Sequence, residues 1–494
     1  MNGLSDKRAR PCSAEKPHEK CGVVAVFGVE RAAETLYNGL FALQHRGQEG
    51  AGIVVSDGKS LRTCKGMGLV SEVFTGDFTE HLTGRVGIGH VRYSTTGSSR
   101  LMNVQPFQAE CRDGVWAIAH NGNLVNAGEL RERYRKQGAI FQTTTDSEIL
   151  LHQLADPAFF DHQNRIRLAL AELRGSFAFV IARLDCIYAA RDPWGIRPLS
   201  LGRLDKGFVV ASETCALQQI GATFIRDIAP GELIKISAEG IQSMRFADVP
   251  VGGYGQCVFE HIYFARPNSH VFGQSVYTTR TAIGRCLARE SPVEADVVIP
   301  IPDSGVLAAL GYSHESGIPF EMGFIRNHYV GRTFIMPSQR SRKNSVDLKL
   351  AVVPEVVAGK RVIVIDDSII RGTTIRKRIE VLRIAGAREV HVRIACPPTR
   401  FPCFFGIDFP ETAELAANGR SIDQVRRMCG ADSMGYLSLE GLQSVFGQPS
   451  HFCYGCFDGH YPCDTEHVSC RHALEQGDDD PLEARHHRYG VMLQ

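Results

Sequence analysis

The segment that most constrains this chain runs from Val362 to Thr374, where four aliphatic residues end in two adjacent aspartates and a short polar stretch. A continuous aliphatic run is typical of a strand buried on both faces of a parallel sheet. Open α/β sheets bind ligands outside the carboxyl ends of their strands. Asp366 and Asp367 follow the predicted strand directly, so the segment predicts a ligand site at a strand end.

The polar residues of this segment suit a sugar phosphate. Small and hydroxyl-bearing residues before a helix N-terminus offer N–H and O–H groups to a phosphate, and the predicted helix begins near Ile375. Paired carboxylates bind Mg²⁺ or ribose hydroxyls. The alternative is an acidic, capped turn between strand and helix that binds no ligand.

The same residues resemble the phosphoribosyl-pyrophosphate (PRPP) loop of the type I phosphoribosyltransferases, and they are most similar to the loop of the glutamine PRPP amidotransferase family. The resemblance implies that Asp366 and Asp367 hold Mg²⁺ or the ribose hydroxyls. It also implies a hydroxyl near Mg²⁺ from Ser304, because Pro302–Gly305 resembles the pyrophosphate loop of the family. The residues that it assigns to the 5′-phosphate are Ser368, Ile369, Ile370, Arg371, Gly372, Thr373 and Thr374.

Length and composition exclude several other classes of protein. A chain of 494 residues exceeds one ordinary core, which predicts two or three domains. A net charge of +1 argues against a nucleic-acid partner bound through bulk charge. We find no apolar run near the roughly 18 residues that indicate a membrane span. The 15 cysteines are irregularly spaced, which favours reduced thiols in a cytoplasmic protein over a secreted disulfide scaffold.

Predicted strands and helices divide the chain into four parts. Residues 1–20 have no apolar core, so they are not a secretory signal, and the family resemblance implies a propeptide. Residues 21–250 contain many short strands and few helices, which predicts an α+β domain of stacked antiparallel sheets covered by helices. Residues 254–447 alternate strand with helix, which predicts an α/β domain with a parallel sheet. Residues 448–494 form a C-terminal segment with a CxxC pair and a mobile tail.

Polar clusters in the first domain resemble the glutaminase domain of the N-terminal-nucleophile amidotransferases. The clusters are His90–Gly97, His120–Asn123 and Thr145–Glu148, and they match in order and spacing together with Cys21 and the turn His45–Gly52. The resemblance implies one nucleophile, an oxyanion hole and two groups for the ends of glutamine. These are Cys21 as nucleophile, the Asn121 side chain and the Gly122 N–H as oxyanion hole, Arg92 for the α-carboxylate and Asp146 for the α-ammonium.

This chemistry suits glutamine, because an amide is a poor electrophile that requires a strong nucleophile and a stabilised oxyanion. Removal of residues 1–20 would give Cys21 a free α-amine with a reference pKa of about 7.7–8.0, which can accept the thiol proton. Each residue also has a plainer interpretation. Cys21 is then a structural cysteine, Arg92 and Asp146 are surface charges, and Asn121-Gly122 is a type I′ hairpin turn.

Two further regions of the chain resemble parts of the same family. Residues Asn327–Gln339 resemble the flexible loop that closes over PRPP, and basic residues follow them. Such a loop would exclude water from an electron-poor ribose carbon. The cysteine pattern of the cluster-containing members implies a [4Fe–4S] cluster, with zinc as the alternative. Its four ligands here would be Cys257, Cys403, Cys453 and Cys456.

The combined features predict an enzyme that converts glutamine, PRPP and water into 5-phosphoribosylamine, glutamate and pyrophosphate, the first committed step of purine biosynthesis. Glutaminases joined to fructose 6-phosphate or aspartate acceptors lack the Asp366 loop. A regulatory paralogue that binds PRPP or nucleotides without catalysis remains the alternative. The family resemblance also implies purine nucleotide feedback inhibitors and a homotetramer or homodimer, with Mg²⁺ as a cofactor.

Overall fold

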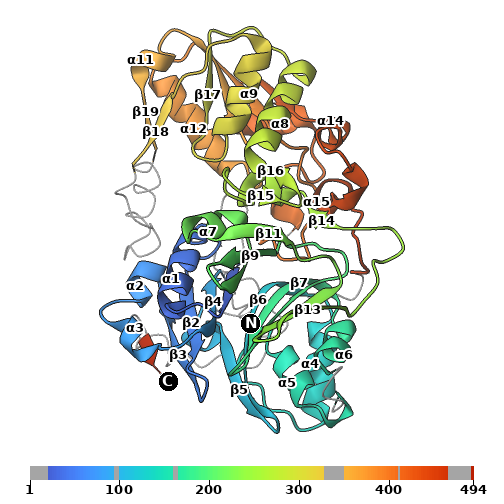
Figure 1. The fold of residues 1–494 in the computed structure, drawn as a ribbon. Coiled ribbons are helices and arrows are strands. Elements are labelled where there is room, and N and C mark those ends of the chain that lie inside the picture. Colours follow the sequence, from blue (N-terminus) through green and yellow to red (C-terminus); the bar gives the residue numbers. More distant parts are fainter. Residues whose placement is uncertain are drawn as a thin grey trace, which may run out of the picture.

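The computed structural model describes residues 21–93, 99–159, 165–327, 350–409, 412–465 and 491–493. The predicted propeptide, most of the predicted closing loop and Cys470 lie outside these ranges. The described chain forms two bodies in contact, with the N-terminal half below and the C-terminal half above in Figure 1. Within the described ranges, no helix has the length and apolar character needed to cross a membrane.

The N-terminal half contains two antiparallel sheets. The first has the strand order β11-β9-β10-β1-β4-β2-β3-β24, and the second has the order β13-β12-β8-β7-β6-β5. The strands of the first sheet are Gly22–Phe27 (β1), Gly50–Ser56 (β2), Leu61–Met67 (β3), Val86–Arg92 (β4), Ser200–Leu204 (β9), Gly207–Ala211 (β10), Thr223–Asp227 (β11) and Val491–Leu493 (β24). Those of the second are Phe107–Cys111 (β5), Gly114–Leu124 (β6), Gly175–Ala182 (β7), Ile187–Arg191 (β8), Glu232–Ser237 (β12) and Gly240–Arg245 (β13).

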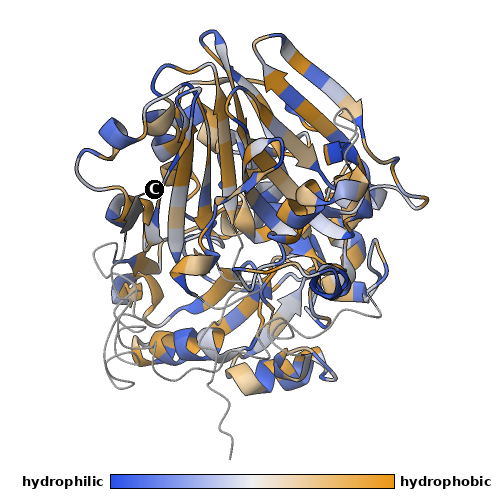
Figure 2. Ribbon diagram, turned by 90° about the horizontal axis from the view of Figure 1, so that it is seen from below, coloured by the Kyte–Doolittle hydropathy of each residue, from blue (hydrophilic) through white to orange (hydrophobic). Residues whose placement is uncertain are grey.

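The two sheets pack face to face. Val23 and Ile88 of the first sheet share one apolar core with Ala119 and Val180 of the second. Alternate residues of the same strands point outward and are covered by helices, as the two-residue period of a strand requires. Figure 2 shows how much of the central strands is apolar. The covering helices are Ala32–Ala42 (α1) and Thr214–Gln219 (α7) on the first sheet, and Ala127–Lys136 (α4), Ile149–Ala155 (α5) and Arg165–Glu172 (α6) on the second.

The C-terminal half is built on a four-stranded parallel sheet with the order β17-β20-β21-β22. Parallel neighbours require crossover connections, and helices supply them here. The strands are Val297–Pro300 (β17), Arg361–Asp366 (β20), Glu389–Ile394 (β21) and Ser433–Tyr436 (β22). The helices are Val276–Glu290 (α8), Val306–Ser316 (α9), Thr373–Ile384 (α12), Ile422–Cys429 (α13) and Leu439–Ser444 (α14).

The predicted fold class is confirmed, since antiparallel sheets precede a parallel sheet. One local prediction is wrong: Val491–Leu493 are not part of an unpatterned tail but form β24, antiparallel to β3. The physical reason is that β3 is an edge strand whose free N–H and C=O groups can pair with any extended segment. Backbone pairing of this kind leaves no signature in the composition of the tail.

Candidate active sites

Cys21 lies at the centre of the first sheet, directly before β1. Gly22 pairs with Val91 of the antiparallel strand β4, so the next residues, Cys21 and Arg92, lie side by side on the two chains. The Cys21 side chain is buried, its thiol donates to the Tyr93 carbonyl at 3.7 Å, and its φ of 65° is left-handed. A non-glycine residue in this conformation is uncommon and concentrates at functional sites. The structure thus brings the predicted nucleophile and the predicted carboxylate-binding arginine together.

The predicted oxyanion hole lies on the facing sheet. Asn121 and Gly122 are internal to β6, where they pair with Ala178 and Phe177 of β7, so they are not a hairpin turn. The Asn121 amide is fully buried, and neither its oxygen nor its nitrogen bonds to a described residue. Leaving a buried polar group unsatisfied costs about 1–3 kcal/mol, which a bound substrate oxygen would offset. The geometry therefore suits Asn121 as a donor to a ligand.

Close packing explains the glycine beside Asn121. A Cβ at Gly122 would stand 2.1 Å from the Ser176 carbonyl oxygen and 2.7 Å from His120 Nε2. No larger residue fits between these atoms. The backbone of β6 can approach β7 at this point only because Gly122 has no side chain.

Asp146 is held by a network of buried hydrogen bonds beside the oxyanion residues. Its carboxylate accepts from Leu124 N at 2.8 Å and from Ser147 Oγ at 3.2 Å. His120 Nδ1 lies 2.9 Å from Ser147 Oγ, and burial lowers the pKa of His120, so the ring is neutral near pH 7. Gln105 completes the network by accepting from His120 N at 2.7 Å. The sequence motifs contain His120, but they assign no role to it or to Gln105.

The PRPP-type loop lies at the carboxyl end of β20, beside the turn after β17. Ser304 Oγ donates to Asp367 Oδ1 at 2.5 Å, and Ser368 Oγ donates to Asp367 Oδ2 at 2.7 Å. Asp366 Oδ1 accepts from Asp367 N at 3.0 Å. Two of the three predicted Mg²⁺ ligands are therefore in contact, although they are 63 residues apart in the chain. An all-oxygen donor set of this kind suits Mg²⁺.

The rest of the loop buries its apolar side chains and presents its backbone to a ligand. The Ile369 and Ile370 side chains are buried, and Ile370 O accepts from Ala416 N at 2.7 Å. Gly372 adopts a φ of 81° directly before α12, so the loop ends at the N-terminus of a 12-residue helix. Helix N-termini and small-residue loops bind phosphate through N–H groups. The geometry fits the predicted 5′-phosphate site.

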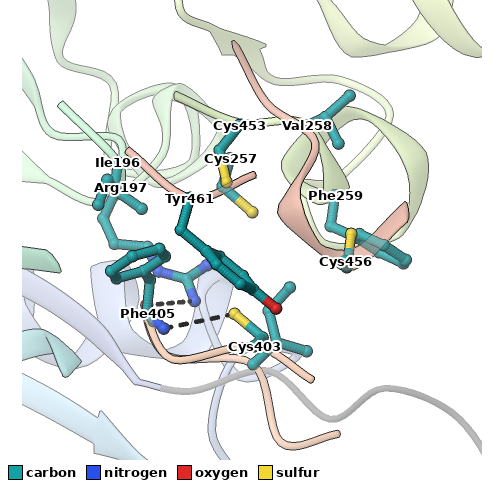
Figure 3. Close-up of a pocket in the computed structure, with 11 residues that line it drawn as sticks. Ile196, Arg197, Cys257, Val258, Phe259, Cys403, Phe405, Cys453, Cys456 and Tyr461 are labelled. Carbon is teal, nitrogen blue, oxygen red and sulfur yellow. Dashed lines mark hydrogen bonds between the residues drawn. The ribbon is translucent and has the colours of Figure 1, made fainter. Parts of the chain in front are cut away.

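The four predicted cysteine ligands line one small cavity between the two halves, with a volume of about 20 Å³. Cys257 and Cys453 pair through the short parallel strands Gln256–Cys257 (β14) and Phe452–Cys453 (β23). Cys456 lies in the helical turn Gly455–Asp458 (α15), and Cys403 Sγ accepts from Phe405 N at 3.4 Å. Figure 3 shows the four thiols around the ring of Tyr461.

Nearby cysteines do not belong to this cavity. Cys396 lies next to Asp366 and Asp367, which help to raise the pKa of its buried thiol after burial itself. Cys463 lies near Asp192, and burial raises its pKa to about 12. Across the described ranges, no three His, Cys, Asp or Glu side chains converge tightly enough to hold a single metal ion.

Together the fold and the two site geometries define a glutamine amidotransferase domain joined to a phosphoribosyltransferase domain. Models of these families match the chain, with the glutamine amidotransferase domain at residues 90–219 and the phosphoribosyl transferase domain at residues 281–399. The chain is 50% identical over 471 residues to Amidophosphoribosyltransferase 1, chloroplastic, of Arabidopsis thaliana, which covers 95% of this chain and 83% of the relative.

Two solved structures agree with this assignment. Glutamine PRPP amidotransferase from B. subtilis, complexed with ADP and GMP, matches with a TM-score of 0.86 and 45% identity, covering 92% of this chain and 100% of that one. A structure titled as the allosteric regulatory enzyme of purine biosynthesis matches with a TM-score of 0.87 and 46% identity, covering 92% and 99% of the two chains. The chain belongs to the amidophosphoribosyltransferase family.

Proposed function

We propose that this chain is a glutamine-dependent amidotransferase that converts PRPP, glutamine and water into 5-phosphoribosylamine, glutamate and pyrophosphate in purine biosynthesis. The observation that carries the proposal is the presence of both centres in one chain. Cys21, Arg92 and the unsatisfied Asn121 amide converge in one half, and Asp367 with Ser304 converges in the other. The chain is also 50% identical to an amidophosphoribosyltransferase over 95% of its own length.

In the first half-reaction, Cys21 Sγ attacks the amide carbon of glutamine. The α-amine of Cys21, once freed by removal of residues 1–20, accepts the thiol proton and transfers it to the departing nitrogen, which leaves as ammonia. Asn121 and the Gly122 N–H stabilise the oxyanion, and Arg92 orients the α-carboxylate. Water then cleaves the thioester, which releases glutamate and restores the thiol.

In the second half-reaction, the nitrogen lone pair of ammonia forms a bond to ribose C1, the bond from C1 to pyrophosphate breaks, and the nitrogen loses a proton. Asp366, Asp367 and Ser304 would hold Mg²⁺, which supplies charge stabilisation to the departing pyrophosphate. The loop from Ser368 to Thr374 would anchor the 5′-phosphate and so hold C1 in place.

Four thiols around one cavity fit a [4Fe–4S] cluster. Each thiolate of such a cluster binds a different iron atom, so its ligand sulfurs stand farther apart than those around one zinc ion. Cys257, Cys403, Cys453 and Cys456 all line the same cavity, as the ligands of one cluster must. Neither Cys21 nor Asp367 lines the cavity, so we assign the cluster a structural role.

We expect protein purified without oxygen to contain about four iron and four sulfide ions per chain. Cys456→Ser should lose most of this iron and the visible absorption that accompanies it. Cys463→Ser should retain both, because Cys463 lies outside the cavity. Colourless protein with stoichiometric zinc would contradict the cluster assignment.

The function is tested by supplying purified protein, Mg²⁺ and glutamine with or without PRPP. Glutamate and pyrophosphate should form in equal amounts and only when PRPP is present. Intact mass should show a chain that begins at Cys21, because an internal Cys21 has no amine to use. Active protein that retains residues 1–20 would contradict the processing step, and PRPP binding without turnover would indicate the regulatory paralogue.

The proposal extends to control and assembly. The B. subtilis relative was solved with ADP and GMP, so we include inhibition by purine nucleotides. We also propose a homotetramer or homodimer in the reducing cytoplasm, as predicted above. Sedimentation with and without these nucleotides measures both the assembly and its response.

A further inference from the structure

A cluster of four fully buried charged side chains lies where the two halves meet. Glu260 comes from the C-terminal half, in the helical turn Glu260–Phe264 (η3), and it is bonded by two arginines of the N-terminal half. Arg46 Nη2 donates to Glu260 Oε2 at 2.6 Å, and Arg197 Nη1 donates to Glu260 Oε1 at 3.2 Å. None of the three side chains is more than 1% exposed.

Glu213 of the N-terminal half is the fourth member. It accepts from Arg46 Nε and, across the boundary, from Ser269 Oγ at 2.7 Å and Arg266 N at 2.9 Å. Each acid of the cluster thus accepts at least one donor across the boundary between the halves. Burial raises the pKa of Glu213 and of Glu260, but the neighbouring guanidinium groups outweigh it and lower both, so both acids are charged. We call Arg46, Arg197, Glu213 and Glu260 the interdomain clamp.

The clamp continues directly into the glutamine site. Gly47 follows Arg46 and packs so closely on β4 that a Cβ there would lie 2.6 Å from the Val91 carbonyl carbon and 2.7 Å from Arg92 N. Glu49 N, two residues later, donates to Arg92 O at 2.9 Å. The position of Arg46 therefore sets the position of the backbone that carries Arg92.

On its other side the clamp is fixed by a helix of the phosphoribosyltransferase half. The buried Arg280 of α8 donates to His261 O at 2.7 Å and to Ala265 O at 2.8 Å, which fixes the turn that begins with Glu260. The turn that carries Glu260 is therefore held by a helix of the phosphoribosyltransferase half.

We propose that Glu260 is a positioning residue for the glutamine site, which fixes Arg92 through Arg46 in a register set by the phosphoribosyltransferase half. The proposal rests on the function proposed above. It requires a contiguous set of contacts, and these run from Arg280 through η3, Glu260 and Arg46 to Arg92. Such a set carries coupling only when changing one member shifts the other site, so the proposal is tested by mutation.

The test is Glu260→Gln, which keeps the size of the side chain and removes its charge. We expect the KM for glutamine to rise at least about tenfold, because Arg92 is no longer held. Synthesis from PRPP and added ammonia bypasses the glutamine site and should stay within about twofold of the parent. The matched control is Glu315→Gln, which removes a half-exposed partner of Arg289 in the same half and should change neither activity.

Parallel loss of the glutamine-dependent and ammonia-dependent activities, or no change in either, would overturn the proposal. Arg197→Lys keeps the charge but replaces the guanidinium that donates to Glu260, so it serves if Glu260→Gln does not fold; the same split of the two activities is expected. A variant that loses only the glutamine-dependent activity and keeps the thermal transition of the parent shows a positioning role. A lowered thermal transition would indicate instability. A parent protein inactive with both nitrogen donors would instead reject the proposed function.

Discussion

Replacing Cys21 by alanine is expected to lower glutamine-dependent synthesis by at least about 10³-fold, as removal of a nucleophile does in other covalent enzymes. Synthesis from PRPP and added ammonia should persist, since Asp367 and Ser304 lie in the other half and do not contact Cys21. The measurement is the rate of pyrophosphate release with glutamine or with ammonium chloride. The two rates should therefore separate in this variant.

Cys111→Ala is the matched control for this experiment. Cys111 ends β5 in the same half, is half-buried, and lies outside every cluster described above. It should keep both activities. Equal loss of the two activities in Cys21→Ala would show that Cys21 supports the fold instead of attacking glutamine.

Replacing Asp367 by asparagine is expected to have the opposite pattern and lower both activities by about 10²–10³-fold, the usual effect of removing one electrostatic group from a reacting centre. The substitution removes a negative charge from the proposed Mg²⁺ site and leaves Ser304 Oγ without its carboxylate partner. Both nitrogen donors react at the same ribose carbon, so both fail together. Pyrophosphate release at increasing Mg²⁺ and PRPP measures the loss.

Asp296→Asn tests whether this effect is specific to the site. Asp296 precedes β17 of the same parallel sheet, and it pairs with Arg361 at the end of β20 opposite to Asp367. Its loss should change stability slightly and leave both rates near those of the parent. Retained ammonia-dependent synthesis in Asp367→Asn would remove Asp367 from the proposed site.

Local patterns predicted most of the elements on which the sites are built. The aliphatic run before Asp366 became strand β20 of the parallel sheet, as predicted. Strand β6 runs through the polar cluster His120–Asn123 and ends only at Leu124. Asn121 and Gly122 have turn-like chemistry, but pairing with β7 overrides that local preference.

By itself, the sequence determined the order of the two domains and the residues proposed to carry the two chemistries, because each motif is short and its spacing is local. Only the tertiary structure brought Ser304 to Asp367, left the Asn121 amide without a described partner and joined Arg46, Arg197, Glu213 and Glu260 into one clamp. Those four charges lie far apart in the chain. A charge buried away from water is costly unless an opposite charge pairs with it. The four charges meet this condition only after the two halves have packed together.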